Sequence, residues 1–128
     1  MPKLDRVLQQ LRKVCLALPE TSETISWGHP NFRAGKKMFA ALDEYQGQLC
    51  IAFKTTLDEQ ERLVKDERFF EAPYSGHLGW VCFKADGKID WEELKTYLVA
   101  SYRLVALKRM ITALDSQPQR GGRQKPGA

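Results

Sequence analysis

The chain has 128 residues, of which 43% are hydrophobic and 28% are charged, and its formal net charge is +4. This composition is that of an ordinary soluble globular protein, and the length suits one domain that buries about two thirds of its unfolded surface. Disorder is excluded for the bulk of the chain. Residues 115–128 contribute +2, which leaves +2 for residues 1–114, whereas a dedicated nucleic-acid-binding domain usually has a stronger basic excess.

Three cysteines, Cys15, Cys50 and Cys82, are odd in number and lie far apart in the sequence. This spacing fits neither a disulfide framework nor a zinc site, so we expect buried, reduced thiols and a cytoplasmic protein. His29 and His77 are equally isolated from other ligand types, so we expect no metal and no cofactor. No apolar run is long enough for a signal core or a membrane span.

Apolar residues recur at a spacing of three and four along the first part of the chain, which predicts a helix. The stripe consists of Leu4, Val7, Leu8, Leu11, Val14, Cys15 and Leu18. Pro19 disfavours the helical conformation at Leu18 and so ends the helix. Residues 20–23 are expected to form a polar connection.

Residues 24–39 combine aromatic side chains, a histidine, turn-forming residues and three cations without a single acid. Trp27 ends a short β-favouring run, and Gly28 with Pro30 predicts a tight turn before a new strand that opens at Phe32. Gly35 predicts a second reversal, after which the chain continues as an extended segment. Two reversals in so short a stretch predict adjacent hairpins.

The cations of this stretch, Arg33, Lys36 and Lys37, are expected near a hairpin tip. Lys54, at the exit of a later strand, joins them if the strands are neighbours. Two interpretations stay open. Exposed lysines commonly keep a hairpin soluble and protect a sheet edge, and the same cations are suited to phosphate contacts.

Two further β-favouring runs, residues 38–42 and 49–53, flank Gly47, which predicts another hairpin. Thr56 and Glu59 then form a capping-box pattern, which predicts a short helix to about residue 66.

A brief strand is expected over residues 69–72 and another over residues 80–83. The loop over residues 74–79 holds two glycines, but it does not open a helix, so a phosphate cradle is disfavoured. Asp90 and Glu93 form a second capping box, which opens a third helix.

The apolar stripe of this helix includes Ser101 and Tyr102, which are therefore expected to face the sheet and to make structural hydrogen bonds. Lys108 and Arg109 are expected at the carboxyl end of the same helix, where they complement its dipole.

Together these patterns predict an α+β domain over residues 1–114, in the order α-βββ-α-ββ-α. It is expected to contain a single antiparallel five-stranded sheet with helices mainly on one face. Residues 115–128 lack apolar anchors and are expected to form a flexible tail. The tail carries Arg120, Arg123 and Lys125, and such tails raise non-specific affinity for polyanions.

Four short motifs add a resemblance to these patterns. They are Trp27-Gly28-His29-Pro30, Gly35-Lys36-Lys37-Met38-Phe39, Gly79-Trp80-Val81 and Ser101-Tyr102. In their order and spacing they resemble the YjbR family, also called MmcQ, over residues 1 to about 110. The resemblance implies a small bacterial α+β domain with a fold like that of CyaY and secretion chaperones. Members are often named DNA-binding by analogy of fold.

We therefore expect a non-catalytic binding module whose hairpin cations, with Lys54 and the tail, contact DNA weakly and without sequence preference. Trp27 or Phe32 would stack on bases only if its ring is exposed. The alternative is a protein-interaction or chaperone-like module without nucleic-acid binding, since folds of this kind also hold peptides.

We also expect a monomer that is not an enzyme, because no nucleophile has a base and an acid at a recognisable spacing. Iron binding of the frataxin type is not expected. The acidic first helix of frataxin-like proteins is replaced here by Lys3, Arg6, Arg12 and Lys13.

Overall fold

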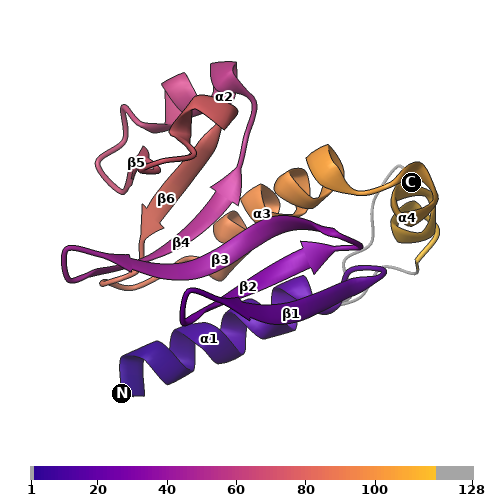
Figure 1. Cartoon of the computed structure of the whole chain (residues 1–128), viewed down its shortest axis with the longest axis horizontal. Helices are drawn as coiled ribbons and strands as arrows, with labels where there is room; N and C mark the ends of the chain where they lie inside the picture. The colour runs from indigo at the N-terminus through magenta and orange to yellow at the C-terminus, as the bar shows by residue number, and fades with distance from the viewer. Residues whose placement is uncertain (1, 118–128) are drawn as a thin grey trace.

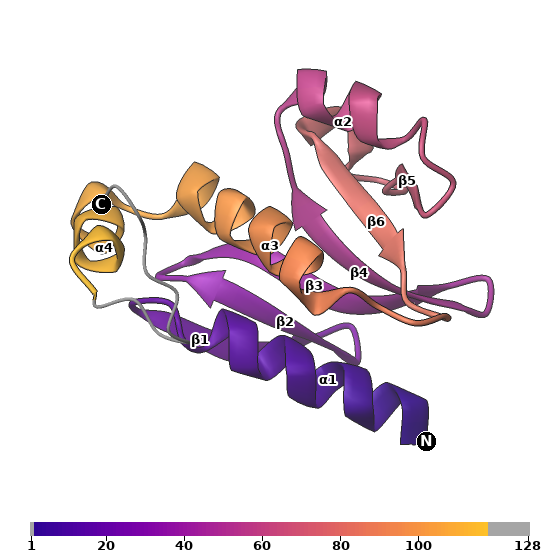
Figure 2. The same ribbon diagram turned by 180° about the vertical axis from the view of Figure 1, so that it is seen from behind.

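The computed structural model describes residues 2–117 and shows one antiparallel sheet of six strands in the order β1-β2-β3-β4-β6-β5. The strands are β1 (Thr21–Ser26), β2 (His29–Ala34), β3 (Lys37–Tyr45), β4 (Gln48–Lys54), β5 (Phe69–Glu71) and β6 (Trp80–Lys84). The helices are α1 (Pro2–Cys15), α2 (Leu57–Leu63), α3 (Trp91–Val105) and α4 (Lys108–Asp115), with a short 3-10 helix η1 (Gly76–Leu78). α1 and α3 lie side by side across one face of the sheet (Figure 1 and Figure 2).

The α+β architecture matches the expectation, but the sheet has six strands rather than five, and four strands rather than three precede α2. Residues 21–23 were expected in a polar connection and instead begin β1. This segment is polar because β1 lies at an edge of the sheet, and its Glu23 carboxylate accepts a hydrogen bond from Arg12 Nε of α1 over 2.7 Å.

The third helix is also shorter than expected, because α3 ends at Val105 and Lys108 begins a separate helix. Ala106 and Leu107 both adopt extended backbone conformations, with ψ of 153° and 156°, and so break the helical path. Asp115 is the last residue of α4 rather than the first of a tail. The rest of the expected tail, residues 118–128, lies outside the described residues.

The main core lies between the sheet and the helices and includes the fully buried side chains Leu11, Phe32, Phe53, Leu98 and Tyr102. A second, smaller cluster lies on the other face of the sheet, where Ala41, Cys50, Ala52, Ala72 and Cys82 are flanked by partly buried larger residues. Over residues 2–117, no helix is both long and apolar enough to cross a membrane.

Candidate interaction surfaces

The turn between β2 and β3 lies beside α4 at one end of the molecule (Figure 1 and Figure 2). Gly35 holds this turn with a φ of 63°, and a β-carbon on it would lie 2.7 Å from Met110 Cε of α4. The Gly35 amide also donates a hydrogen bond to the Glu20 carbonyl over 2.9 Å. These contacts bring the start of α4 to the same end of the molecule as the turn, and we call the cations of the turn and of the first residue of α4 the basic end: Arg33, Lys36, Lys37 and Lys108.

Two carboxylates in the segments around the basic end are held by arginines. Arg109 Nη2 lies 2.8 Å from Glu20 Oε1, and Arg103 Nη2 lies 2.6 Å from Asp115 Oδ1. These hydrogen bonds lower the pKa of both carboxyl groups. Within the described part of the chain, no carboxylate oxygen lies within 4.0 Å of a charged nitrogen of the basic end.

The cations of the basic end differ in whether their side chains are already engaged in hydrogen bonds. Lys36, Lys37 and Lys108 are exposed. The Arg33 guanidinium is partly occupied, because Nη1 donates to the Lys36 carbonyl over 2.8 Å and Nε donates to Thr24 Oγ1 over 3.2 Å. Arg33 therefore also stabilises its own turn. The sequence pattern missed Lys108 as a member, because nothing local to the chain marks the end of α3 at Val105.

Lys54 does not join the basic end as proposed from the sequence. It lies beyond the last paired residues of β3 and β4, and its Nζ donates to the Leu78 carbonyl over 2.6 Å. Its side chain is thus tied to the 3-10 helix η1. The tail cations Arg120, Arg123 and Lys125 lie outside the described residues.

The two aromatic residues proposed for base stacking have opposite environments. Phe32 is 0% exposed and belongs to the main core, so its proposed role in stacking is wrong. Trp27 is 96% exposed in the two-residue turn between β1 and β2. This turn is at the other end of β2 from Gly35, so Trp27 is not part of the basic end.

Ser101 has a structural position between two separating strands. Phe39 forms a β-bulge in β3: Phe32 pairs with Ala40 and Arg33 pairs with Met38, so Phe39 has no partner residue in β2. At the same level β3 and β4 part, and the Ser101 hydroxyl accepts from the Lys54 amide over 2.9 Å and donates to the Phe39 carbonyl over 2.7 Å. α3 thus supplies the hydrogen bonds that the two strands do not make to each other.

Other motif residues also stabilise the fold. The Tyr102 hydroxyl donates to the Pro19 carbonyl over 2.7 Å, and its ring packs edge-on against Phe39. Gly79 has a φ of 93°, and a β-carbon there would lie 2.1 Å from the Thr55 carbonyl oxygen. The expected inward orientation of Ser101 and Tyr102 is confirmed, since both are buried.

His29 lies on the face of the sheet that α1 and α3 do not cover. Its Nε2 is 3.5 Å from Asp43 Oδ1, and Tyr45 donates from its hydroxyl to Asp43 Oδ2 over 3.0 Å. Burial and the nearby Asp43 carboxylate raise the pKa of Tyr45. Among the described residues, no group of three or more metal-binding side chains could hold an ion.

All three cysteines are free and buried, as expected. Burial raises the pKa of Cys15, and the hydrogen bond with Cys82 together with burial raises the pKa of Cys50. Both thiols are therefore held in the neutral form, which is a poor nucleophile.

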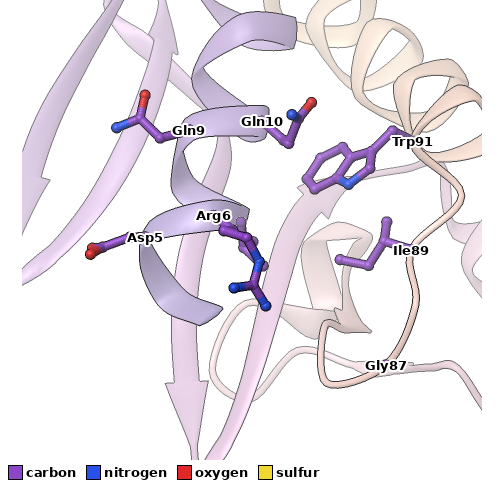
Figure 3. A pocket seen from close by; sticks show the side chains of 8 residues that line it. Asp5, Arg6, Gln9, Gln10, Gly87, Ile89 and Trp91 are labelled. Carbon is purple, nitrogen blue, oxygen red and sulfur yellow. The ribbon is translucent and has the colours of Figure 1, made fainter. Parts of the chain in front are cut away.

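A groove of about 520 Å³ lies between the first half of α1 and the segment that leads into α3. Figure 3 shows Trp91 and Ile89 facing Arg6 and Gln10, whereas Asp5 and Gln9 of α1 point away. Sequence reasoning did not identify this groove. Ile89 and Trp91 also pack against the main core, so their apolar character has a structural cause.

Comparisons with known proteins agree with this architecture. The chain is similar to the crystal structure of Deinococcus radiodurans protein DR2400, which contains a DUF419 domain, with 25% sequence identity and a TM-score of 0.69. The match covers 92% of this chain and 95% of that chain. No curated protein matches the chain. The YjbR family model matches residues 16–104, which is well over half of the sequence, and the chain therefore belongs to the YjbR family.

Proposed function

We propose that this protein is a non-catalytic binding module whose basic end contacts the phosphate backbone of DNA. The observation that carries the proposal is the convergence of Arg33, Lys36, Lys37 and Lys108 at one end without a carboxylate partner among the described residues. Unpaired cations on one surface release counterions when they meet phosphates, and this release supplies most of the affinity in non-specific binding.

The binding is expected to be weak and independent of sequence. The chain has a net charge of +4, and Arg120, Arg123 and Lys125 supply three of those charges, so residues 2–117 carry only +1. The basic end is made of a turn and the start of a short helix rather than of a helix shaped to enter a groove. A dissociation constant on the order of 10⁻⁴ to 10⁻⁶ M at physiological salt is expected.

Salt titrations of binding to fluorescent duplex and single-stranded DNA test the proposal. About four phosphate contacts predict that the logarithm of the affinity for duplex falls with the logarithm of salt at a slope of about −3.6. The double variant Lys36→Glu, Lys37→Glu should lose most of this binding and flatten the slope. The matched control is Lys65→Glu, Lys95→Glu, which changes the net charge equally at exposed lysines outside the basic end.

A third variant separates the folded domain from its C-terminal extension. Removal of residues 118–128 should weaken binding while the Lys36 and Lys37 dependence remains. If this truncation abolishes binding and the two control lysines matter as much as the two turn lysines, then the basic end is not a DNA-binding surface.

Protein interaction is the second candidate function, and the conformation of Trp27 favours it. A large aromatic side chain is 96% exposed at a hairpin tip, on a backbone with a φ of 54° that residues other than glycine rarely adopt. Exposed aromatic residues of this kind are common anchors in protein interfaces. Loss of partner binding in a Trp27→Ser variant, with DNA binding unchanged, would separate the two candidate functions.

A further inference from the structure

Among residues 2–117, no strand lies beyond the edge strand β1, so the backbone groups on its outer side are not paired within the sheet. The two-residue turn at Trp27 and Gly28 closes on the pair Ser26 and His29, and the register continues without a shift to Thr21 and Ala34. In an antiparallel ladder, backbone pairs alternate between hydrogen-bonded and non-hydrogen-bonded positions. The amides and carbonyls of Ser22, Thr24 and Ser26 therefore face β2, and those of Thr21, Glu23 and Ile25 face outward.

The identity of the residue opposite Ile25 supports the assignment of this pair as non-hydrogen-bonded. It is Pro30, which has no amide hydrogen to donate. A proline is compatible with the ladder only where no amide is needed between the two strands.

Of the features that normally protect a sheet edge, β1 has only one charged side chain, Glu23, and that charge is held by Arg12. The strand has six residues and contains no lysine, proline, glycine or bulge. The opposite edge provides a comparison within the same molecule. β5 has only three residues, contacts α2, and follows Arg68, whose guanidinium lies 5.3 Å from the centre of the Phe69 ring. Within the part of the chain that the structure describes, the β5 edge is thus the short and covered one.

The side chains around β1 indicate the chemistry of an incoming strand. Ile25 is 65% exposed on β1, and Trp27 follows it at the tip of the hairpin. The only charged side chain of β1, Glu23, is held by Arg12 through two hydrogen bonds of 2.7 and 3.0 Å. An apolar side chain placed beside Ile25 would bury surface without exposing an unpaired charge.

We infer that β1 binds an extended segment of another protein, which adds to the sheet as a further antiparallel or parallel strand with apolar side chains beside Ile25 and Trp27. This inference rests on the protein-interaction candidate above and specifies its binding mode. Backbone hydrogen bonds to Thr21, Glu23 and Ile25 supply pairing, and the alternate side chains of the segment supply selectivity.

A second copy of the chain suits this edge less well. In antiparallel pairing, residues directly opposite each other point to the same face. Two registers meet this condition and pair five residues of β1 with the copy: residues 21–25 with residues 25–21, or residues 22–26 with residues 26–22. One places Ile25 opposite Thr21 of the copy, and the other places it opposite Glu23. Neither brings an apolar side chain opposite Ile25, so a segment of another protein with an apolar residue at this position is the better occupant.

Selection of phage-displayed random peptides on the full chain tests the inference, followed by binding measurements with the enriched peptide made synthetically. Enriched sequences should alternate apolar and polar residues. Ile25→Pro should lower their affinity about tenfold, because it removes one outward amide and its hydrogen bond. The matched control Ile25→Val keeps that amide and should change the affinity less than about twofold. Circular dichroism and a thermal melt establish that both variants are folded.

Amide hydrogen exchange measured by NMR locates the peptide. Added peptide should slow exchange at Thr21, Glu23 and Ile25 and leave Ser22 and Thr24 nearly unchanged. If peptides bind in a Trp27-dependent manner but Ile25→Pro has no effect, strand addition is wrong and the protein-interaction candidate stands. If no peptide is enriched over an uncoated surface, both are wrong. Protection that grows with protein concentration in the absence of peptide identifies a second copy as the occupant and overturns the inference.

Discussion

At the scale of single residues, Trp27 combines two features that do not stabilise the fold. Its side chain is almost fully exposed, and its backbone has a φ of 54°, next to Gly28 with a φ of 80°. A turn with two such residues is best formed by Asn-Gly, and a residue with a β-carbon other than Asn or Asp meets a steric cost there. Trp27 therefore costs stability, and such costs are typical of residues kept for binding.

We predict that Trp27→Asn raises the free energy of unfolding by about 1 kcal/mol, because it relieves backbone strain and gives up little buried surface. Urea denaturation followed by fluorescence of the remaining tryptophans measures this change. The same variant should lose binding to any peptide selected on the wild-type chain. A lower unfolding free energy would mean that the indole ring packs on the protein in solution.

The Ser101 hydroxyl stabilises the sheet by hydrogen bonding, which is a structural role and not that of a nucleophile. We predict that Ser101→Ala lowers the free energy of unfolding by about 1 to 3 kcal/mol, because the Lys54 amide and the Phe39 carbonyl would lose their common partner in the interior.

A threonine of the same helix provides the control for this change. The Thr96 hydroxyl donates to the Glu92 carbonyl over 3.2 Å on the exposed side of α3. Thr96→Ala should therefore change the stability by less than about 0.5 kcal/mol. Equal effects in both variants would contradict a bridging role for Ser101.

At the scale of secondary-structure elements, the contact between the β2–β3 turn and α4 assembles the basic end. Met110 is buried under Gly35, and the chain can reach this position only because α3 ends and two extended residues redirect it. Lys108, the first residue of α4, is thereby brought to the same end of the molecule as the turn cations. The electrostatic surface is thus a consequence of one apolar contact between distant segments.

We predict that Gly35→Ala lowers the free energy of unfolding by the roughly 1 to 2 kcal/mol expected from a left-handed backbone and by a smaller further amount, because the flexible end of Met110 must shift within a buried site to admit the new methyl group. Gly28→Ala is the matched control, since Gly28 has a φ of 80° and a β-carbon there would meet no atom within 4 Å. Denaturation curves of the two variants measure the difference, and faster amide exchange in α4 should accompany Gly35→Ala. An equal loss in both variants would show that α4 does not press on the turn.

At the scale of the whole molecule, the basic end and the Trp27 hairpin lie at opposite ends of β2. The basic end gathers cations around Gly35, and the Trp27 hairpin presents apolar groups next to the unprotected edge of β1. The edge of β1 runs between them, from Ser26 to Thr21, which pairs with Ala34 beside Gly35, so a nucleic acid and a protein segment would contact neighbouring but different residues of one sheet.

The three buried thiols report on the integrity of the whole fold. We predict that the native protein reacts with an aromatic disulfide reagent at pH 8 only at the rate of unfolding, because Cys15, Cys50 and Cys82 are each 0% exposed. The raised pKa of Cys15 and Cys50 acts in the same direction, since thiolate is the reactive form.

In urea all three thiols should react at once. A Ser116→Cys variant, which adds a thiol at an exposed position of the native chain, provides the positive control. Rapid reaction of a native cysteine would reveal local opening of the sheet, and the modified residue would identify the strand that opens.

Local signals in the sequence predicted most of the elements. The apolar stripe of α1, the turn glycines and the capping residues all depend on neighbours within a few positions. Thr56 accepts the Glu59 amide at the start of α2, and Asp90 accepts the Glu92 and Glu93 amides at the start of α3. These contacts are local, so a short stretch of chain is sufficient to specify them.

The sequence by itself thus determined the α+β class, the hairpins, the burial of Ser101 and the resemblance to the YjbR family. Only the tertiary structure decided that polar β1 is an edge strand, that Phe32 is buried while Trp27 is exposed, and that Lys108 rather than Lys54 joins the turn cations. The physical reason is that periodicity shows which side of an element is apolar but not which distant segment covers it. The contacts of Arg12 with Glu23 and of Gly35 with Met110 join segments far apart in the chain, and they settle these positions.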